Sequence, residues 1–231
     1  MRPESLVHMI RWSTRREASG CPPVGQHERV DPADFVAKYP TLLHLADVRS
    51  WPSIERHGLL SAAEIVRRWQ VPPDRAEALL TRKRPEPVLL DHPELGVAVL
   101  RDQHPLREHL LAPALTDGMN VGDWLRLLNG FVFFFTSSDR LQALRSAYRT
   151  TPAVLLTVRT RSLVQEHGAR VRLAGMNTGN TSRRVKERGA GTFLPVCRYD
   201  LRARVQEVAV MDEVSDLRDH LLSAELLPAD D

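Results

Sequence analysis

The stretch TLLHLADVRSWPSIERHGLLS, residues 41–61, decides the fold and contains the first candidate site residue. Its first six residues, TLLHLA, form an apolar run of strand length that carries His44. Pro52 suits the first turn of a helix and Gly58 suits a helix end with positive φ, so WPSIERHGLL is expected to contain one short helix. A histidine on a strand that runs directly into a capped helix is expected to have a fixed position.

A second strand-like run lies near the other end of the chain. Residues 203–210, ARVQEVAV, contain one acid, Glu207. A carboxylate at the centre of a strand is costly to bury without a partner, so Glu207 should face either solvent or a polar cleft. A lone strand histidine is also more often a core or surface residue than a ligand contact. Taken together, one His and one Glu far apart in the sequence suggest a divided site.

The composition is that of an ordinary globular protein. The chain has 231 residues, of which 42% are hydrophobic and 26% charged, enough for one domain with a core. Residues 1–30 mix charges, glycines and prolines without periodicity, so we expect a poorly ordered N-terminal extension followed by a single domain over residues 31–231. The net charge of +3 permits a phosphate-bearing ligand or nucleic acid without requiring one.

The cysteines and the hydropathy bear on the location of the protein. Cys21 and Cys197 are far apart and belong to no CxxC or Cys/His pair, so neither a disulfide framework nor a zinc site is expected. No apolar run reaches the ~18 residues of a spanning helix, and the Arg-rich start is not followed by the apolar segment of a signal peptide. We therefore expect a cytoplasmic protein with no metal and no membrane partner.

The remaining segments mix helices and strands without a regular βαβ order. Helices are expected in DPADFVAKYP, SAAEIVRRW, PPDRAEALLTRKR, VGDWLRLLNG, SSDRLQALRSAY and VSDLRDHLLSAELL, and a hairpin in VLLDHPELGVAVLRD. Further strands are expected in FVFFFT, AVLLTVRT, VRLAG and TFLPVCRY. The aromatic run at residues 131–135 predicts a central strand buried on both faces. The polar stretch MNTGNTSRRVKERGAG predicts a long loop with a functional role.

Several common chemistries are excluded by their motifs. The chain contains no GxxxxGK[ST], no GxGxxG after a strand, no GxSxG and no HExxH. What remains is a set of isolated polar residues on or beside apolar strands: His44, Arg101, Thr136, Asn177 and Glu207.

Three of these segments resemble a known family. LLHLADVRSWPSIERHGLLS is similar to the opening of the DNA ADP-ribosyltransferase toxins, where a strand histidine precedes a short helix and a Gly-Leu pair. VQEVAV resembles the Ala-Glu-Val-Leu-Val strand that carries their catalytic glutamate, and FVFFFT resembles their central aromatic strand. The similarity touches residues 41–61, 131–145 and 203–211. The chain also resembles a bacterial family of unknown function that shares WPSIERHGLLS, RDQ, LLNG, VFFF and TFLP, which supplies no activity.

The toxin resemblance implies an α+β fold with a split, strongly bent mixed sheet around an NAD cleft and flanking helices. It implies transfer of ADP-ribose from NAD, as co-substrate, to a macromolecular acceptor with release of nicotinamide. Glu207 would stabilise an oxocarbenium-like ribose and accept a proton from the nucleophile, as carboxylates do in glycoside hydrolysis. Arg101 would be the second catalytic candidate, because a guanidinium can bind the pyrophosphate or position the acceptor. The candidate NAD contacts are His44, Phe133, Phe135, Thr136 and Asn177.

The chain departs from the toxin pattern after Gly58. No loop there aligns with the toxins' substrate and catalytic elements, so their catalytic arginine has no assigned counterpart. Two alternatives therefore stay open. One is a catalytically silent nucleotide- or nucleic-acid-binding module on the same scaffold. The other is RNA 2′-phosphotransfer, although the basic residues that would hold an internal phosphate are not recognisable.

Two basic clusters are candidates for contact with an acceptor. One is Arg82, Lys83 and Arg84, and the other is Arg183, Arg184, Lys186 and Arg188 in the long loop. Clustered cations would suit a nucleic acid, but neither run is interleaved with the aromatics that stack single-stranded bases, and a solvated loop is the competing interpretation. An antitoxin or immunity protein is a further candidate partner of a toxin-like enzyme.

Overall fold

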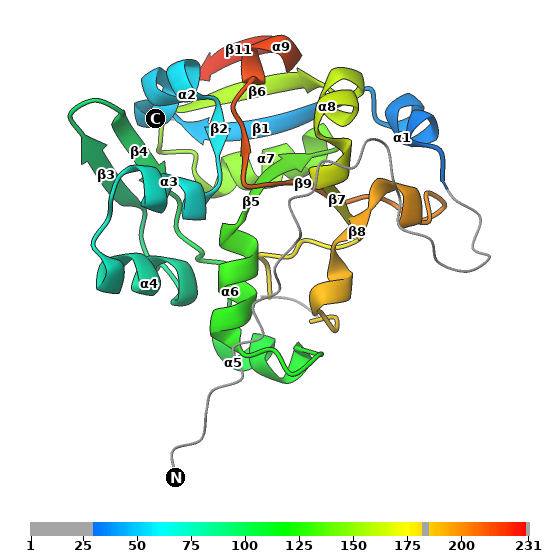
Figure 1. Cartoon of the computed structure of the whole chain (residues 1–231), viewed down its shortest axis with the longest axis horizontal. Coiled ribbons are helices and arrows are strands. Elements are labelled where there is room, and N and C mark those ends of the chain that lie inside the picture. Colours follow the sequence, from blue (N-terminus) through cyan, green and yellow to red (C-terminus); the bar gives the residue numbers. More distant parts are fainter. Residues whose placement is uncertain (1–29, 182–184, 230–231) are drawn as a thin grey trace.

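The computed structural model describes residues 30–181 and 185–229, so the expected extension at residues 1–29 lies outside the described part. Seven strands form one large sheet in the order β11-β6-β1-β5-β9-β7-β8 (Figure 1). In chain order they are β1 (Thr41–Asp47), β5 (Phe131–Phe135), β6 (Ala153–Arg159), β7 (Val171–Ala174), β8 (Leu194–Pro195), β9 (Glu207–Met211) and β11 (Leu221–Leu227).

All pairings between neighbouring strands of this sheet are antiparallel over the described residues. The expectation of a mixed sheet is therefore wrong. The direction in which two strands pair depends on how the chain returns between them, and no local pattern in the sequence records that return when the strands are far apart.

Helices and two small sheets flank the large sheet. The helices are α1 (Pro32–Lys38), α2 (Trp51–His57), α3 (Ala62–Arg68), α4 (Pro73–Thr81), α5 (Glu108–Leu111), α6 (Val121–Asn129), α7 (Ser138–Ala147), α8 (Thr160–His167) and α9 (Leu217–His220). The small sheets are the hairpin β3 (Val88–His92) with β4 (Gly96–Leu100), and β2 (Leu59–Leu60) with β10 (Glu213–Val214). In Figure 1 the hairpin, α3 and α4 lie on one side of the molecule, and α1 and α8 on the other.

Three of the expected helices begin at a residue whose side chain caps them. Asp31 accepts from the amide of Ala33, Ser61 accepts from that of Glu64, and Asn120 with Asp123 forms a reciprocal capping box. The expected helix after residue 50 is present, but the Ser50 hydroxyl does not cap it. That hydroxyl accepts from the Val99 amide instead.

The aromatic strand β5 is central, as predicted, and its two faces meet different surroundings. Val132 and Phe134 are buried in the largest apolar cluster, together with residues of β6 and β9. Phe131 and Phe133 alternate with them and pack against a second cluster around Trp124. This second face is only partly buried, which leaves rings available to line a cavity.

The sheet is weakly joined at one place, between β1 and β5. A single residue pair, Leu43 and Phe135, connects these strands, whereas β1 pairs with β6 along its whole length and β5 pairs with β9 over five positions. The sheet is therefore continuous in strand order but nearly divided in its pairing. At the opening, the His44 side chain bonds the Phe133 carbonyl over 2.8 Å.

Two expected elements are wrong. VSDLRDHLLSAELL is not one helix, because only α9 is helical and the rest is β11, paired antiparallel with β6. The backbone groups along that edge of β6 need partners, and this requirement overrides a modest helix propensity. TFLPVCRY is not a full strand either. Only Leu194–Pro195 pairs with β7, at the sheet edge where a proline without an N–H is tolerated, and a 3₁₀ turn follows.

The structure also bears on the expectations that the chain has no disulfide and no membrane-spanning helix. Cys197 is disulfide-bonded, which differs from the expectation drawn from cysteine spacing. Among the helices of the described residues, none is both long enough and apolar enough to cross a membrane. Cytoplasmic location stays a prediction.

Candidate functional site

A cavity of about 860 Å³ opens where β1 and β5 part. Its volume is in the range of small-molecule binding sites. Six of the seven predicted site residues line it: His44, Arg101, Phe133, Phe135, Asn177 and Glu207. These residues come from β1, β5, β9 and two loops, so the fold brings together side chains that are more than 160 positions apart in the chain.

His44 is held in one tautomer by its strand neighbour. A carbonyl oxygen can only accept, so Nδ1 donates its hydrogen to the Phe133 carbonyl and Nε2 keeps a lone pair. The pKa of His44 is lowered to about 4, mainly because the ring is buried. The hydrogen bond to the Phe133 carbonyl opposes this shift, and the positive charge of Arg101 adds to it. His44 is therefore neutral at physiological pH and offers an acceptor at Nε2.

Glu207 is buried, with a relative exposure of 6%, at the first position of β9. One carboxylate oxygen, Oε2, accepts from the Thr178 amide over 3.1 Å and from the Thr178 hydroxyl over 2.6 Å. Of the two environments expected for this acid, the structure has the polar cleft. The long loop holds the carboxylate from one side, and Glu207 lines the same cavity as His44.

Arg101 follows β4 and brings a cation to the cavity. Its guanidinium carbon lies 4.6 Å from the centroid of the Tyr148 ring. Its Nη1 atom is buried and has no hydrogen-bond partner among the described residues. Burial lowers the pKa of Arg101, and Tyr148, Asp47 and Asp102 offset part of that effect. A buried N–H group without a partner is costly, which favours an acceptor from a ligand at this position.

The hairpin that delivers Arg101 is fastened to α2 by two buried serines. Ser50 accepts from the Val99 amide over 2.9 Å, and Ser53 donates to the Leu95 carbonyl over 2.8 Å. The strand β4 is thereby fixed beside the end of β1. Residue 101, which directly follows β4, lines the cavity together with the β5 aromatics.

Asn177 and Thr136 were both predicted to contact a ligand, but only one of them lines the cavity. Asn177 lines the cavity beside Thr178. Thr136 does not line it, so the prediction that it contacts a ligand there is not supported by the structure. Its hydroxyl donates to the Val205 carbonyl over 2.9 Å, because residue 136 follows the end of β5 and faces the segment that leads into β9.

One arginine of each basic cluster is buried and does not add to a cationic surface. Arg84 and Arg188 are buried, with relative exposures of 7% and 3%. Arg188 donates to the Thr178 carbonyl and lies near the Trp124 ring, so it supports the loop that holds Glu207. Lys186 is exposed, while Arg183 and Arg184 lie outside the described residues.

Some cavity residues were not singled out by the sequence. Tyr148 and Asp102 both line the cavity, and burial together with Asp102 raises the pKa of the tyrosine hydroxyl. Asp47 ends β1 and forms a two-point ion pair with Arg49. The segment RDQ, residues 101–103, was the only local signal for Asp102. Nothing in the helix around Tyr148 distinguishes that tyrosine from a core residue.

The sequence comparisons assign the chain to a family whose function is unknown. A model of a family of unknown function, DUF7002, matches residues 40–221. The chain belongs to this family. Neither the curated proteins nor the solved structures contain a significant match. All the cavity residues of this DUF7002 protein lie within the matched range.

A second cluster of titratable groups lies away from the cavity of this DUF7002 protein. His167 and His220 approach Asp216 through Nε2, at 2.7 Å and 3.2 Å, and the two Nε2 atoms are 3.3 Å apart. A metal ion would need Nε2 of both rings as a lone-pair donor. However, Arg170 donates to Nδ1 of His167 over 2.5 Å, which places the hydrogen of the neutral ring on Nε2.

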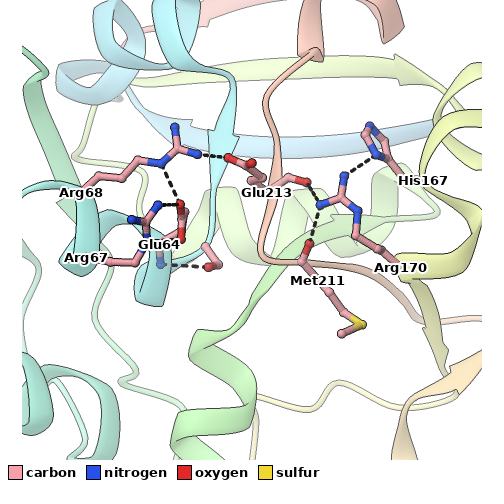
Figure 2. Close-up of polar contacts among 8 residues, drawn as sticks. Glu64, Arg67, Arg68, His167, Arg170, Met211 and Glu213 are labelled. Carbon is pink, nitrogen blue, oxygen red and sulfur yellow. Dashed lines mark hydrogen bonds and ion pairs between the residues drawn. The ribbon is translucent and has the colours of Figure 1, made fainter. Parts of the chain in front are cut away.

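Arg170 therefore makes this cluster a hydrogen-bonded support. Figure 2 shows the guanidinium between His167 and the carbonyls of Met211 and Glu213, and the two carbonyl bonds measure 3.1 Å and 2.9 Å. On the other side, Arg68 pairs with both Glu64 and Glu213 (Figure 2). The two arginines together fix the chain between β9 and β10.

The partly buried, neutral His44 predicts a loss of stability in acid. Its pKa of about 4 in the folded protein is below the ordinary 6.5, so the unfolded chain takes up a proton that the folded chain excludes. The free energy of unfolding should fall as the pH drops from about 6.5 to about 4, by at most about 3 kcal/mol from this group. Urea unfolding at several pH values should show a flatter profile for His44→Gln than for the wild type. His109→Gln, at an exposed position, should keep the wild-type slope; equal slopes for all three proteins would contradict the assignment.

Proposed function

We propose that this DUF7002 protein is an NAD-dependent ADP-ribosyltransferase with an ADP-ribosyltransferase-like fold, which transfers ADP-ribose to a macromolecular acceptor and releases nicotinamide. The observation that carries the proposal is the meeting of Glu207, His44 and Arg101 in one cavity. Each of the three is a site residue that the sequence alone predicts. A carboxylate, a neutral imidazole and a guanidinium are also the groups that this reaction requires.

The cavity residues suit the parts of NAD. Nε2 of His44 is an acceptor for a ribose hydroxyl, and the Arg101 Nη1 atom is a donor for a pyrophosphate oxygen. Phe133 and Phe135 supply apolar surface beside these polar groups, which suits a planar aromatic ring. Asn177 adds an amide that can both donate and accept.

Glu207 supplies the group that the chemistry depends on. The bond from the ribose to nicotinamide breaks and its electron pair leaves with nicotinamide, so the ribose gains positive charge. A fixed carboxylate in a cavity stabilises this charge more than a solvated one would. Glu207 can then accept the proton of the attacking acceptor group as the new bond to the ribose forms. The Thr178 contacts keep Oε2 in place before substrate binds.

The acceptor is supported less directly. Lys186 is the exposed described member of the long-loop cluster, whereas Arg188 is committed to the Thr178 carbonyl. A nucleic acid acceptor and an antitoxin or immunity partner remain parts of the proposal that rest on the sequence resemblance, and a cytoplasmic location remains one that rests on the hydropathy of the sequence. Salt-dependent binding of nucleic acid would be the first sign of such an acceptor.

One observation favours a second candidate, a catalytically silent nucleotide-binding module. Oε2 of Glu207 is already bonded twice to Thr178, so the carboxylate has a structural use without any substrate. Such a module would bind NAD in the same cavity without turning it over. Binding and turnover therefore have to be measured separately.

Binding is tested by thermal unfolding with and without millimolar NAD. A ligand that binds only the folded state stabilises it by mass action, by about 2.7 kcal/mol at a hundred times its Kd. We expect NAD to raise the Tm of the wild type and to have little effect on His44→Ala. His109→Ala, which removes an exposed histidine, should respond as the wild type does. If NAD shifted the Tm of His44→Ala as much as that of the wild type, NAD would not bind at this cavity.

A further inference from the structure

The segment that carries Arg101 is held by another arginine, Arg84. This residue follows α4 and is buried, with a relative exposure of 7%. Its Nε donates to the Arg101 carbonyl over 3.0 Å. Its own backbone is joined to Gln103 twice, through the Arg84 amide to Gln103 Oε1 and through the Gln103 amide to the Arg84 carbonyl.

The other end of the guanidinium is anchored in two helices. Nη1 donates to the Leu79 carbonyl over 2.6 Å, and Nη2 donates to Oδ1 of Asn129 over 3.0 Å. Asn129 is the last residue of α6, and its amide nitrogen donates to the Leu80 carbonyl. Leu79 and Leu80 lie in the last turn of α4, where carbonyls lack helical partners and a cation is favourable.

All three side-chain bonds of Arg84 end on neutral oxygens. Burial lowers its pKa to about 10, and the charge of Asp102 opposes this only in part. Burying a guanidinium without a hydrogen-bonded carboxylate costs free energy relative to an apolar side chain. The structural role of Arg84 is to hold α4, α6 and the 101–103 segment in a fixed arrangement, because its planar guanidinium donates to all three.

We propose that Arg84 is a positioning residue for the candidate site, which fixes the backbone of residues 101–103 so that the Arg101 guanidinium is presented to the cavity. Its effect on ligand binding rests on the proposed function, whereas its effect on the segment does not. Arg84 lines the cavity but acts through Arg101. Lysine could not replace it, because one ammonium cannot reach all three acceptors in the arrangement of the fork.

Amide hydrogen exchange of the full chain tests the positioning directly. In Arg84→Lys we expect the amides of Gln103 and Leu106, which are hydrogen-bonded to backbone carbonyls, to exchange at least about tenfold faster. Peptides from β6 should keep the wild-type rate, which shows that the change is local. The control is Arg75→Lys, at an exposed position of α4, and it should leave every rate unchanged. Unchanged exchange at Gln103 and Leu106, or equal acceleration throughout the chain, would overturn the proposal.

The same two variants separate this inference from the proposed function. We expect Arg84→Lys to raise the Kd for NAD about tenfold or more, and Arg75→Lys to leave it unchanged. If the wild type does not bind NAD, the proposed function fails, and the exchange result still decides whether Arg84 positions the segment. If NAD binds Arg84→Lys and wild type equally while exchange differs, Arg84 orders the segment without presenting Arg101, and the proposal is overturned.

Discussion

Glu207→Gln is expected to lower the rate of nicotinamide release from NAD by at least about 100-fold while leaving the fold intact. Glutamine has the shape of glutamate and retains an oxygen that can accept from the Thr178 amide and hydroxyl. It has neither the negative charge that stabilises the ribose cation nor the basicity to accept a proton. The loss should therefore appear in the rate of the chemical step rather than in NAD affinity. Release of nicotinamide from purified protein, followed by chromatography, measures it.

The control for this experiment is Glu225→Gln, which makes the same chemical change at an exposed position of β11. It should keep wild-type turnover, and both variants should keep a wild-type Tm. A Glu207→Gln protein with full turnover would remove Glu207 from the chemistry. A wild type that binds NAD but releases no nicotinamide with any acceptor offered would favour the silent module.

Gly58→Ala is expected to destabilise the protein by at least about 3 kcal/mol. Gly58 ends α2 with φ of +74°, and a Cβ at this position would lie 2.2 Å from the Val214 carbonyl oxygen and 2.6 Å from the Ser215 Cα. These are backbone atoms in and just after β10, so they cannot turn aside as a side chain could. Relief would require separating β2 from β10, which also borders the chain that Arg170 and Arg68 hold.

Gly118→Ala separates the two causes of this cost. Gly118 has a similar φ of +69°, but a Cβ there would have no atom within 4 Å. Its substitution should cost only about 1 kcal/mol, which is the price of the backbone conformation alone. Urea unfolding of both variants measures the difference. Equal losses would show that the close approach at Val214 does not constrain the fold.

The parts of the fold that follow from local pattern could be predicted from the sequence. Ser61, Asn120 and Asp123 mark helix starts, Gly58 marks a helix end, and the run of aromatics marks the central strand. The segment β11 could not be predicted, because its strand state depends on the open edge of β6 rather than on its own residues. The antiparallel direction of the whole sheet is likewise a property of the chain path.

In the candidate site, too, some residues could be predicted from local sequence and others could not. His44 and Glu207 could be selected because each is a polar residue in an apolar strand, and the structure places them at one cavity. Thr136 was selected on the same grounds, but its hydroxyl is used by the Val205 carbonyl. Arg84 and Arg188 were interpreted as solvated or acceptor-binding cations, because a run of charges gives no sign of which member is buried. The partners of Arg84 include the Arg101 carbonyl and the Asn129 side chain, which no pattern around residue 84 indicates.

The most direct test of the central claim is a crystal structure of Glu207→Gln with NAD, since slow turnover would preserve the ligand. The account predicts NAD in the cavity between β1 and β5, with the nicotinamide ribose within about 3 Å of the residue 207 side chain and a hydroxyl at Nε2 of His44. It further predicts a phosphate oxygen at the Arg101 guanidinium. NAD bound elsewhere, or bound with its ribose away from residue 207, would contradict it.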